Sequence, residues 1–225
     1  SSNQNVYAKM AGRNIKNKVI EELTSLKKGT TEYIIDGTLT IYDEFPNDLL
    51  LPKYRHKLSQ TSPLLKSSFL NTSYDVITDK LKFDNNYETF KDEFSSYSSN
   101  ANIQQVVDKS NNKIVELRGY QDRYVVARIH NSTFQHVTSV VTQAQIDNAT
   151  NDAALRAILA NLRTIPNALV ETFTYDPLVG MTSRTNFNGL TEFYFYDVFN
   201  RLFLIKDNEG NITKRICYNY AREVE

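Results

Sequence analysis

The residues in this chain best suited to metal or acid–base chemistry are three histidines and a series of carboxylates. His56, His130 and His136 are the only histidines, and none has the spacing to a cysteine or another histidine that zinc sites use. The carboxylates between residues 43 and 88 lack the Asp-x-Asp-x-Asp-Gly order of a calcium loop. We therefore predict no metal site, no catalytic site and no cofactor. The acidic residues are Asp43, Glu44, Asp48, Asp75, Asp79, Asp84 and Glu88.

Other chemistry is only weakly indicated. Cys217 is the only cysteine, so no internal disulfide can form, and a lone cysteine on an aromatic strand is most often a small buried hydrophobe. The chain has no phosphate loop and no Gly-x-Ser-x-Gly motif. A carboxylate pair for glycoside hydrolysis needs only proximity in space, so the sequence leaves that activity open. Rows of tyrosines could stack on sugars, although cross-strand packing accounts for them equally well.

The composition indicates a folded β protein. The 225 residues include 14 Tyr, 12 Phe and no Trp, and aromatic residues favour pleated, half-buried surfaces. Lys plus Arg and Asp plus Glu each number 26, and this balance argues against a nucleic-acid partner or attraction to an anionic membrane. No run of 18 apolar residues occurs, so we predict no membrane-spanning segment.

A repeat near the C-terminus is the strongest pattern. Tyr175-Asp176 recurs 21 residues later as Tyr196-Asp197, and again, weakened, as Tyr218-Asn219. At the same offset after the first two pairs stand Asn186-Phe187-Asn188-Gly189 and Asp207-Asn208-Glu209-Gly210. Such tetrads supply positive φ angles for a tight reversal. Each period therefore predicts one strand, one turn and one returning strand, and Arg201 can pair with Asp197 or Asp207 or lie against a Tyr ring.

The period changes to a helical one before this repeat. Leu155, Ile158, Leu159 and Leu162 share one helix face, and Asn151 or Asp152 can cap the N-terminus. We predict helices over 133–141 and 152–163 inside a mainly antiparallel β chain. We also expect strands over 49–58, 74–83, 87–97 and 124–129, and a hairpin from 100 to 117. The expected segments are a lead-in at 1–30, divergent β-hairpin repeats at 31–130, a helical insert at 131–168 and β-hairpin repeats at 169–225.

One family resemblance rests on these residues. The run from Phe195 through Asp197 and Arg201 to Leu202, continuing to Asp207-Asn208-Glu209-Gly210-Asn211, resembles a YD repeat of the Rhs family. The family pattern is Tyr-Asp-x-x-Gly-Arg-Leu, and here Asn200 stands in place of its Gly. The stretch from Thr174 to Ser183 and the start of the insert at Asp152 are similar to versions found in Bacteroidetes. Asp176-Pro177 lacks the context of the family's aspartyl cleavage motif, so that activity is not carried over.

The resemblance implies a β-hairpin sheet that spirals into a shell. It further implies a non-enzymatic structural or interaction module, the C-terminal part of a large secreted or cell-surface bacterial protein. Its partners would be the upstream part of the same polypeptide or another shell or surface protein, with glycans as a further possibility. The alternatives are a carbohydrate-binding surface module and a toxin-enclosing shell fragment with hydrolase or autoprotease activity. The chain begins at Ser1 without Met, and we expect it to be a piece of a longer protein.

Overall fold

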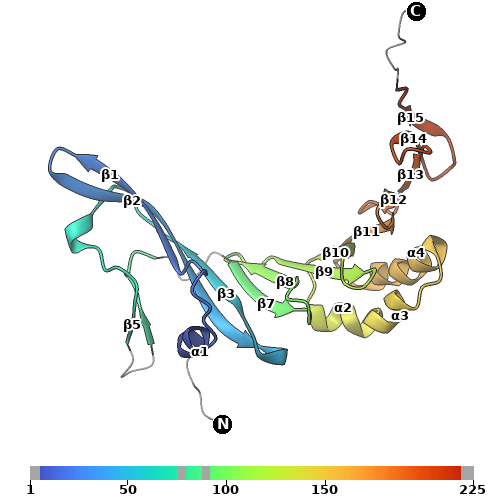
Figure 1. Cartoon of the computed structure of the whole chain (residues 1–225). Coiled ribbons are helices and arrows are strands. Elements are labelled where there is room, and N and C mark those ends of the chain that lie inside the picture. The colour runs from blue at the N-terminus through green and yellow to red at the C-terminus, as the bar shows by residue number, and fades with distance from the viewer. Residues whose placement is uncertain (1–5, 76–79, 88–91, 219–225) are drawn as a thin grey trace, which may run out of the picture. The chain divides into compact units, whose positions relative to one another are not determined.

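The protein is mainly β, as the composition predicts. The computed structural model describes residues 6–75, 80–87 and 92–218, with 47% of the chain in strands and 19% in helices. Thirteen of its strands belong to one antiparallel sheet. The chain divides into two compact units, residues 1–112 and 113–225, and Figure 1 shows their elements coloured along the chain.

The first unit is built on a long hairpin. The strands β1 (Glu21–Lys28) and β2 (Thr31–Phe45) pair antiparallel along their whole shared length. Gly29, with a φ of 61°, makes the reversal between them, which is the left-handed conformation that glycine adopts without strain. This hairpin lies in part within the range that we assigned to a lead-in, and the helix α1 (Val6–Gly12) precedes it.

Shorter elements complete the first unit. β3 (Leu49–Lys57) pairs with β2 and with β7 (Asp92–Tyr97), which pairs with β8 (Ile103–Asp108). β5 (Ser73–Asp75) and β6 (Lys80–Lys82) form a separate two-stranded ribbon, so the single strand expected over 74–83 is wrong. Residues 76–79 and 88–91, which fall within two expected strands, lie outside the described residues. The remaining elements are η1 (Pro46–Asp48), β4 (Leu64–Leu65) and η2 (Lys66–Ser68).

The first unit packs around a small aromatic core. Ile34 and Leu39 are almost completely buried, and they contact Leu58, Phe69 and Tyr87. Gly37 leaves room for this packing, because a Cβ there would stand 3.0 Å from the Tyr87 hydroxyl. The stretch 59–73, expected as loop, contributes Phe69 to this core together with β4 and η2.

The second unit is a meander of hairpins with helices on one face. Its strands follow the chain order from β9 to β15, and each pairs antiparallel with the next. Tyr175 ends β11 and Tyr196 ends β13, while Tyr218 follows β15, so the first two lie on strands of one ladder as the repeat predicts. The strands are β9 (Lys113–Gly119), β10 (Tyr124–His130), β11 (Leu169–Asp176), β12 (Gly180–Thr185), β13 (Thr191–Tyr196), β14 (Leu202–Lys206) and β15 (Ile212–Arg215).

The helical insert is confirmed and consists of several short elements. They are α2 (Phe134–Val140), α3 (Gln143–Asp147), α4 (Asp152–Ala160) and η3 (Asn161–Thr164). Asn151 caps α4 by accepting a hydrogen bond from the Ala154 N–H at 2.9 Å. A second cap, at Thr142, begins α3 and separates it from α2, so the expected helix over 133–141 is one of three.

The largest core of the protein lies between these helices and the sheet. Leu155, Leu159 and Leu162 pack against strand residues such as Ile129 and Val170, and all five are at least 95% buried. The period-3.6 stripe on the helix thus meets one face of the strands. The prediction that the sheet is covered on one side holds for β9 to β11.

Candidate functional site

The repeated hairpins of the second unit are the most regular feature of the chain and form the candidate site. They are held by a loop that recurs with the same hydrogen bonds. In the loop 207–211, Asp207 Oδ1 accepts from the backbone N–H groups of Glu209 and Asn211 at 2.9 and 2.8 Å. The Asp207 N–H donates to the Asn211 carbonyl, and the Gly210 N–H donates to the Asp207 carbonyl. The same four bonds occur in the loops that begin at Asp108, Asn186 and Asp197.

The backbone explains the residue types that the loops require. The fourth loop residue has a positive φ in every case: 63° at Asn111, 81° at Gly189, 58° at Asn200 and 89° at Gly210. Only Gly, Asn and Asp adopt this region readily. The first residue must carry an acceptor oxygen on a short side chain, which Asp and Asn both provide. The turn prediction for the two tetrads is therefore confirmed.

The loop carboxylates titrate accordingly. Hydrogen bonds from the Asn211 side chain and from backbone N–H groups lower the pKa of Asp207 below its ordinary value. Asp108 has a lowered pKa for the same reason, with Asn112 as the first cause. A lowered pKa in the folded state means that these groups add stability above their ordinary pKa and that this stability is lost as the pH falls.

Replacing Asp207 should separate the acceptor from the charge. Asp207→Ala removes both backbone bonds and is expected to lower the melting temperature of the second unit. Asp207→Asn keeps an acceptor oxygen, as Asn186 does naturally, and should melt close to the unchanged protein at neutral pH. Thermal unfolding followed by circular dichroism measures both. Equal losses for the two variants would show that the carboxylate charge, not the acceptor, stabilises the loop.

A tyrosine hydroxyl joins each repeat to the one before it. The Tyr196 hydroxyl donates to the Met181 carbonyl at 2.9 Å, and the Tyr218 hydroxyl donates to the Leu202 carbonyl at 2.8 Å. Met181 and Leu202 each lie six residues after the preceding repeat tyrosine, Tyr175 or Tyr196. We call this bond the tyrosine latch. It gives the sequence period a physical meaning, because the same donor and acceptor positions recur.

The first tyrosine of the series is held differently. The Tyr175 N–H donates to the Tyr120 hydroxyl at 2.8 Å, and the Tyr175 ring stacks on Tyr124 with ring centroids 4.8 Å apart. Burial raises the pKa values of both Tyr120 and Tyr175. The aromatic ladder therefore continues from β11 to the neighbouring β10, where the sequence repeat is no longer visible.

Arg201 has both of the contacts expected for it. Its guanidinium pairs with Asp197 through NH2 at 2.5 Å and lies 4.3 Å from the centre of the Tyr218 ring. The pKa of Asp197 is lowered, first of all by this hydrogen bond from Arg201. Asp207, the other proposed partner, bonds Asn211 instead.

A polar network attaches α4 to the hairpins. The Asp152 carboxylate accepts from the Thr182 hydroxyl, which is 2.8 Å from the hydroxyl of the fully buried Thr174. Thr174 is in turn 2.6 Å from Ser183 Oγ, and Ser183 accepts from Arg156. Both helix residues thus reach across to β11 and β12. Sequence reasoning assigned Asp152 only to capping, because the hydroxyl partners become neighbours through strand pairing.

The other face of the sheet carries a ladder of alternating charges. Glu116 on β9 pairs with Arg128 on β10 at 2.8 Å, and Glu171 on β11 pairs with Arg184 on β12 at 2.5 Å. Arg128 stands directly opposite Glu171 in the strand register. Glu171 is 94% buried, and its hydrogen bond with Arg184 raises the pKa of that guanidinium. The ladder balances its charges internally, in agreement with the zero net charge of the chain.

Tyr194 on this face provides a test by alkaline titration. Burial raises its pKa to about 12, and the hydrogen bond from its hydroxyl to Glu192 adds to the rise. The unfolded tyrosine loses its proton near pH 10, so stability should fall as the pH rises from about 10 to about 12. Tyr194→Phe is expected to remove part of this fall. Chemical unfolding at about pH 9 and about pH 11 measures it, and an unchanged pH slope in the variant would contradict the assignment.

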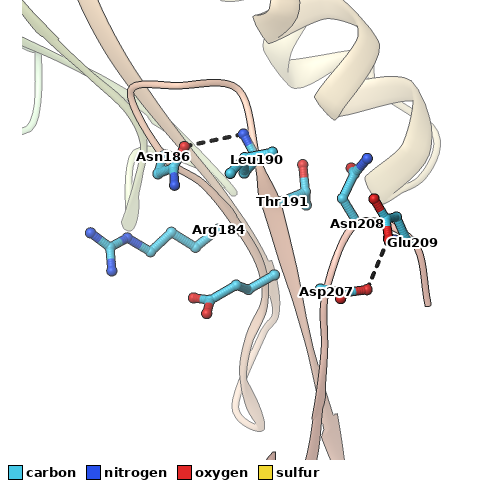
Figure 2. Close-up of a pocket in the computed structure, with 8 residues that line it drawn as sticks. Arg184, Asn186, Leu190, Thr191, Asp207, Asn208 and Glu209 are labelled. Carbon is cyan, nitrogen blue, oxygen red and sulfur yellow. Dashed lines mark hydrogen bonds between the residues drawn. The ribbon is translucent and has the colours of Figure 1, made fainter. Parts of the chain in front are cut away.

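A hollow of about 480 Å³ lies between two neighbouring loops at one end of the hairpins. Figure 2 shows Asn186, Leu190 and Thr191 on one side and Asp207, Asn208 and Glu209 on the other. Arg184 and Glu192 complete the lining. Leu190 is 59% exposed. The hollow is a groove between adjacent repeats, and it combines one apolar side chain with several carboxylates.

The residues singled out for chemistry are dispersed. Within residues 6–75, 80–87 and 92–218, no three His, Cys, Asp or Glu side chains lie close enough to hold a metal ion. His56 is buried on β3, His130 ends β10 with its ring against Phe187, and His136 is exposed on α2. Cys217 is exposed, so the expectation of a buried cysteine is wrong. It lies beyond the end of β15, where no strand or helix covers it.

Most of the acidic residues serve in ion pairs or caps. Asp43 pairs with Lys53, Glu44 with Lys9, and Asp75 with Lys82. Asp48 lies 3.8 Å from Arg13, and Asp84 accepts from the backbone N–H groups of Leu70 and Asn86. Asp79 and Glu88 lie outside the described residues.

Comparison with models of known protein families and with curated proteins gave no match. Within the part of the chain that the structure describes, no helix has the length and apolarity needed to cross a membrane.

Proposed function

We propose that this chain is a non-enzymatic structural module built from β-hairpin repeats of the YD type. It would form part of a β shell or scaffold of a large secreted or cell-surface bacterial protein. The observation that carries the proposal is the pairing of two repeated devices, the four-bond loop and the tyrosine latch, in the same register along the sequence. Both devices stabilise contacts between neighbouring units, which is the property of repeat proteins.

The strand edges support a role in extending a sheet. In the described strand order, β1 and β15 stand at the two ends, and each pairs with one strand. The Ile216 N–H donates to Phe203 on β14, so by alternation the Arg215 N–H points away from β14. An outward row of such groups can pair with another strand. The exposed Lys214 and Arg215 on β15 favour a partner strand with acidic side chains.

The repeat model can be tested by adding a unit. A second copy of residues 197–218 placed directly after Tyr218 supplies a new loop, a new strand pair and a new latch tyrosine. If each unit stabilises its neighbour, the melting temperature of the second unit should rise. The control is an insert of the same residues in scrambled order. Equal melting temperatures for the two inserts would refute the modular interpretation.

The proposed location needs a separate experiment. Brief protease treatment of intact producing cells should remove the protein if it lies at the cell surface, whereas a cytoplasmic control protein should survive. Protection of the chain in intact cells, followed by its digestion after lysis, would contradict the surface location. That result would leave the repeat architecture itself untouched.

A carbohydrate-binding module is the second candidate. Exposed aromatic rings favour it, since Phe187 is 43% exposed, Phe199 69% and Tyr218 41%, and sugar rings stack on such faces. A glycan array distinguishes the two candidates. Binding that is lost on Phe199→Ala would favour the carbohydrate module, and an array without signal at high protein concentration would favour the scaffold.

A further inference from the structure

The two ends of the C-terminal hairpins differ in character. Because the strands are antiparallel, the loops 177–179 and 197–201 lie at one end of the sheet, and the loops 186–190 and 207–211 lie at the other. The first end carries apolar side chains at its loop tips, and we call it the apolar end. The second contains the hollow of Figure 2, and we call it the hollow end.

The apolar end exposes side chains that loops rarely carry. Leu178 and Val198 are each 92% exposed, and Phe199 is 69% exposed. The carboxylate of Asp197 in the same loop is neutralised by Arg201. Loop tips are ordinarily polar, so a set of three bare apolar side chains on two adjacent tips has the character of a contact surface.

Leu178 also sits in an unfavourable backbone conformation. Its φ is 72°, and it follows Pro177 in a turn closed by the Val179 N–H to the Asp176 carbonyl at 3.1 Å. That position of the turn suits Gly or Asn, and the other loops of the array have Gly or Asn where φ is positive. A bulky residue there costs stability. The fold gains nothing from this side chain, because it makes almost no contact.

The hollow end has the complementary properties. Leu190 lines the hollow and Ile212, at the start of β15, is 60% exposed. The lining carries the carboxylates of Glu192, Asp207 and Glu209. Its one cation, Arg184, is paired with Glu171. The apolar end presents an exposed Arg123 in the neighbouring β9–β10 loop, so charge as well as apolar surface is matched between the ends.

We infer that a second copy of this chain docks end to end, with the loop tips at Leu178, Val198 and Phe199 entering the hollow between loops 186–190 and 207–211. The contact joins two different surfaces and is therefore heterologous. Every copy keeps one apolar end and one hollow end unoccupied, so association continues as an open series. This surface is separate from the strand edges invoked above, which extend the sheet sideways.

The test is sedimentation velocity of the full chain over a range of concentrations. The unchanged protein should form a series of species whose mean size grows with concentration. Leu178→Asn removes the apolar tip and suits the positive φ, so it should fold at least as stably and weaken association roughly tenfold or more. Leu190→Asp should do the same from the opposite surface. Val19→Asn, at a side chain that is 61% exposed in the first unit, is the matched control and should associate normally.

Mixing the two variants gives the decisive result. Each retains one intact end, so an equal mixture should form dimers that grow no further. Association of Leu190→Asp alone at the unchanged strength would overturn the proposal, since it would indicate a tip-to-tip contact. A protein that stays monomeric at all concentrations would also overturn it. The added-unit experiment reads stability within one chain, so its outcome is independent of either result.

Discussion

Replacing Gly180 with valine is expected to disrupt the join between the first two repeats. A Cβ at this position would stand 2.6 Å from Tyr196 Cζ, closer than side chains approach in proteins. The Tyr196 ring would have to move, and its hydroxyl would leave the Met181 carbonyl. Overpacking of this kind costs roughly 1–3 kcal/mol. Urea unfolding of the second unit measures the loss of stability.

Two companion variants make this test specific. Gly12→Ala is the matched control, since nothing lies within 4 Å of a Cβ at Gly12, and its effect should stay within about 0.5 kcal/mol. Tyr196→Ala removes the ring that Gly180 accommodates. In the double variant, the cost of Gly180→Val should largely disappear, because residues in contact do not act additively. Strictly additive losses would show that the valine acts elsewhere.

The second large effect is expected from Leu159→Ala. Leu159 is completely buried on α4 and packs in the core between helix and sheet. Truncation leaves a cavity and should cost roughly 2–5 kcal/mol. Because the same helix holds Asp152 and Arg156 against β11 and β12, loosening it should also increase amide exchange along β12.

An exposed position on the same helix provides the control. Ala157 is exposed, and Ala157→Gln keeps a good helix former there. Its effect on urea unfolding should be within about 0.5 kcal/mol. If both helix variants changed stability equally little, the helical insert would be a surface attachment instead of part of the core.

Much of the second unit could be predicted from sequence because its information is local. The loops depend on one acceptor residue and one positive-φ residue three positions later, and both are visible as Asp207 and Gly210. The apolar stripe through Leu155 and Leu159 identified α4 in the same way. These signals need no knowledge of distant partners.

The remaining features depend on contacts between distant residues. Gly180 looks like an ordinary turn glycine until the Tyr196 ring is seen above it. Arg163 donates to the carbonyls of Asn186 and Phe187, a contact that the sequence does not signal. In the first unit, the Tyr-Asp units are not discernible, and the register of β2 depends on pairing with β1, β3 and β4. The buried carboxylate of Glu171 could likewise not be distinguished from a surface glutamate.

The direction of the tyrosine latch has a consequence for how the chain acquires its structure. The donor always lies in the later unit and the acceptor carbonyl in the earlier one. Each hairpin therefore finds its acceptor in polypeptide that has already been synthesised, and none waits for residues still to come. A ribosome delivering this sequence from the N-terminus would release a chain that can close one unit at a time, and truncation after any completed unit would leave only a carbonyl for water to satisfy.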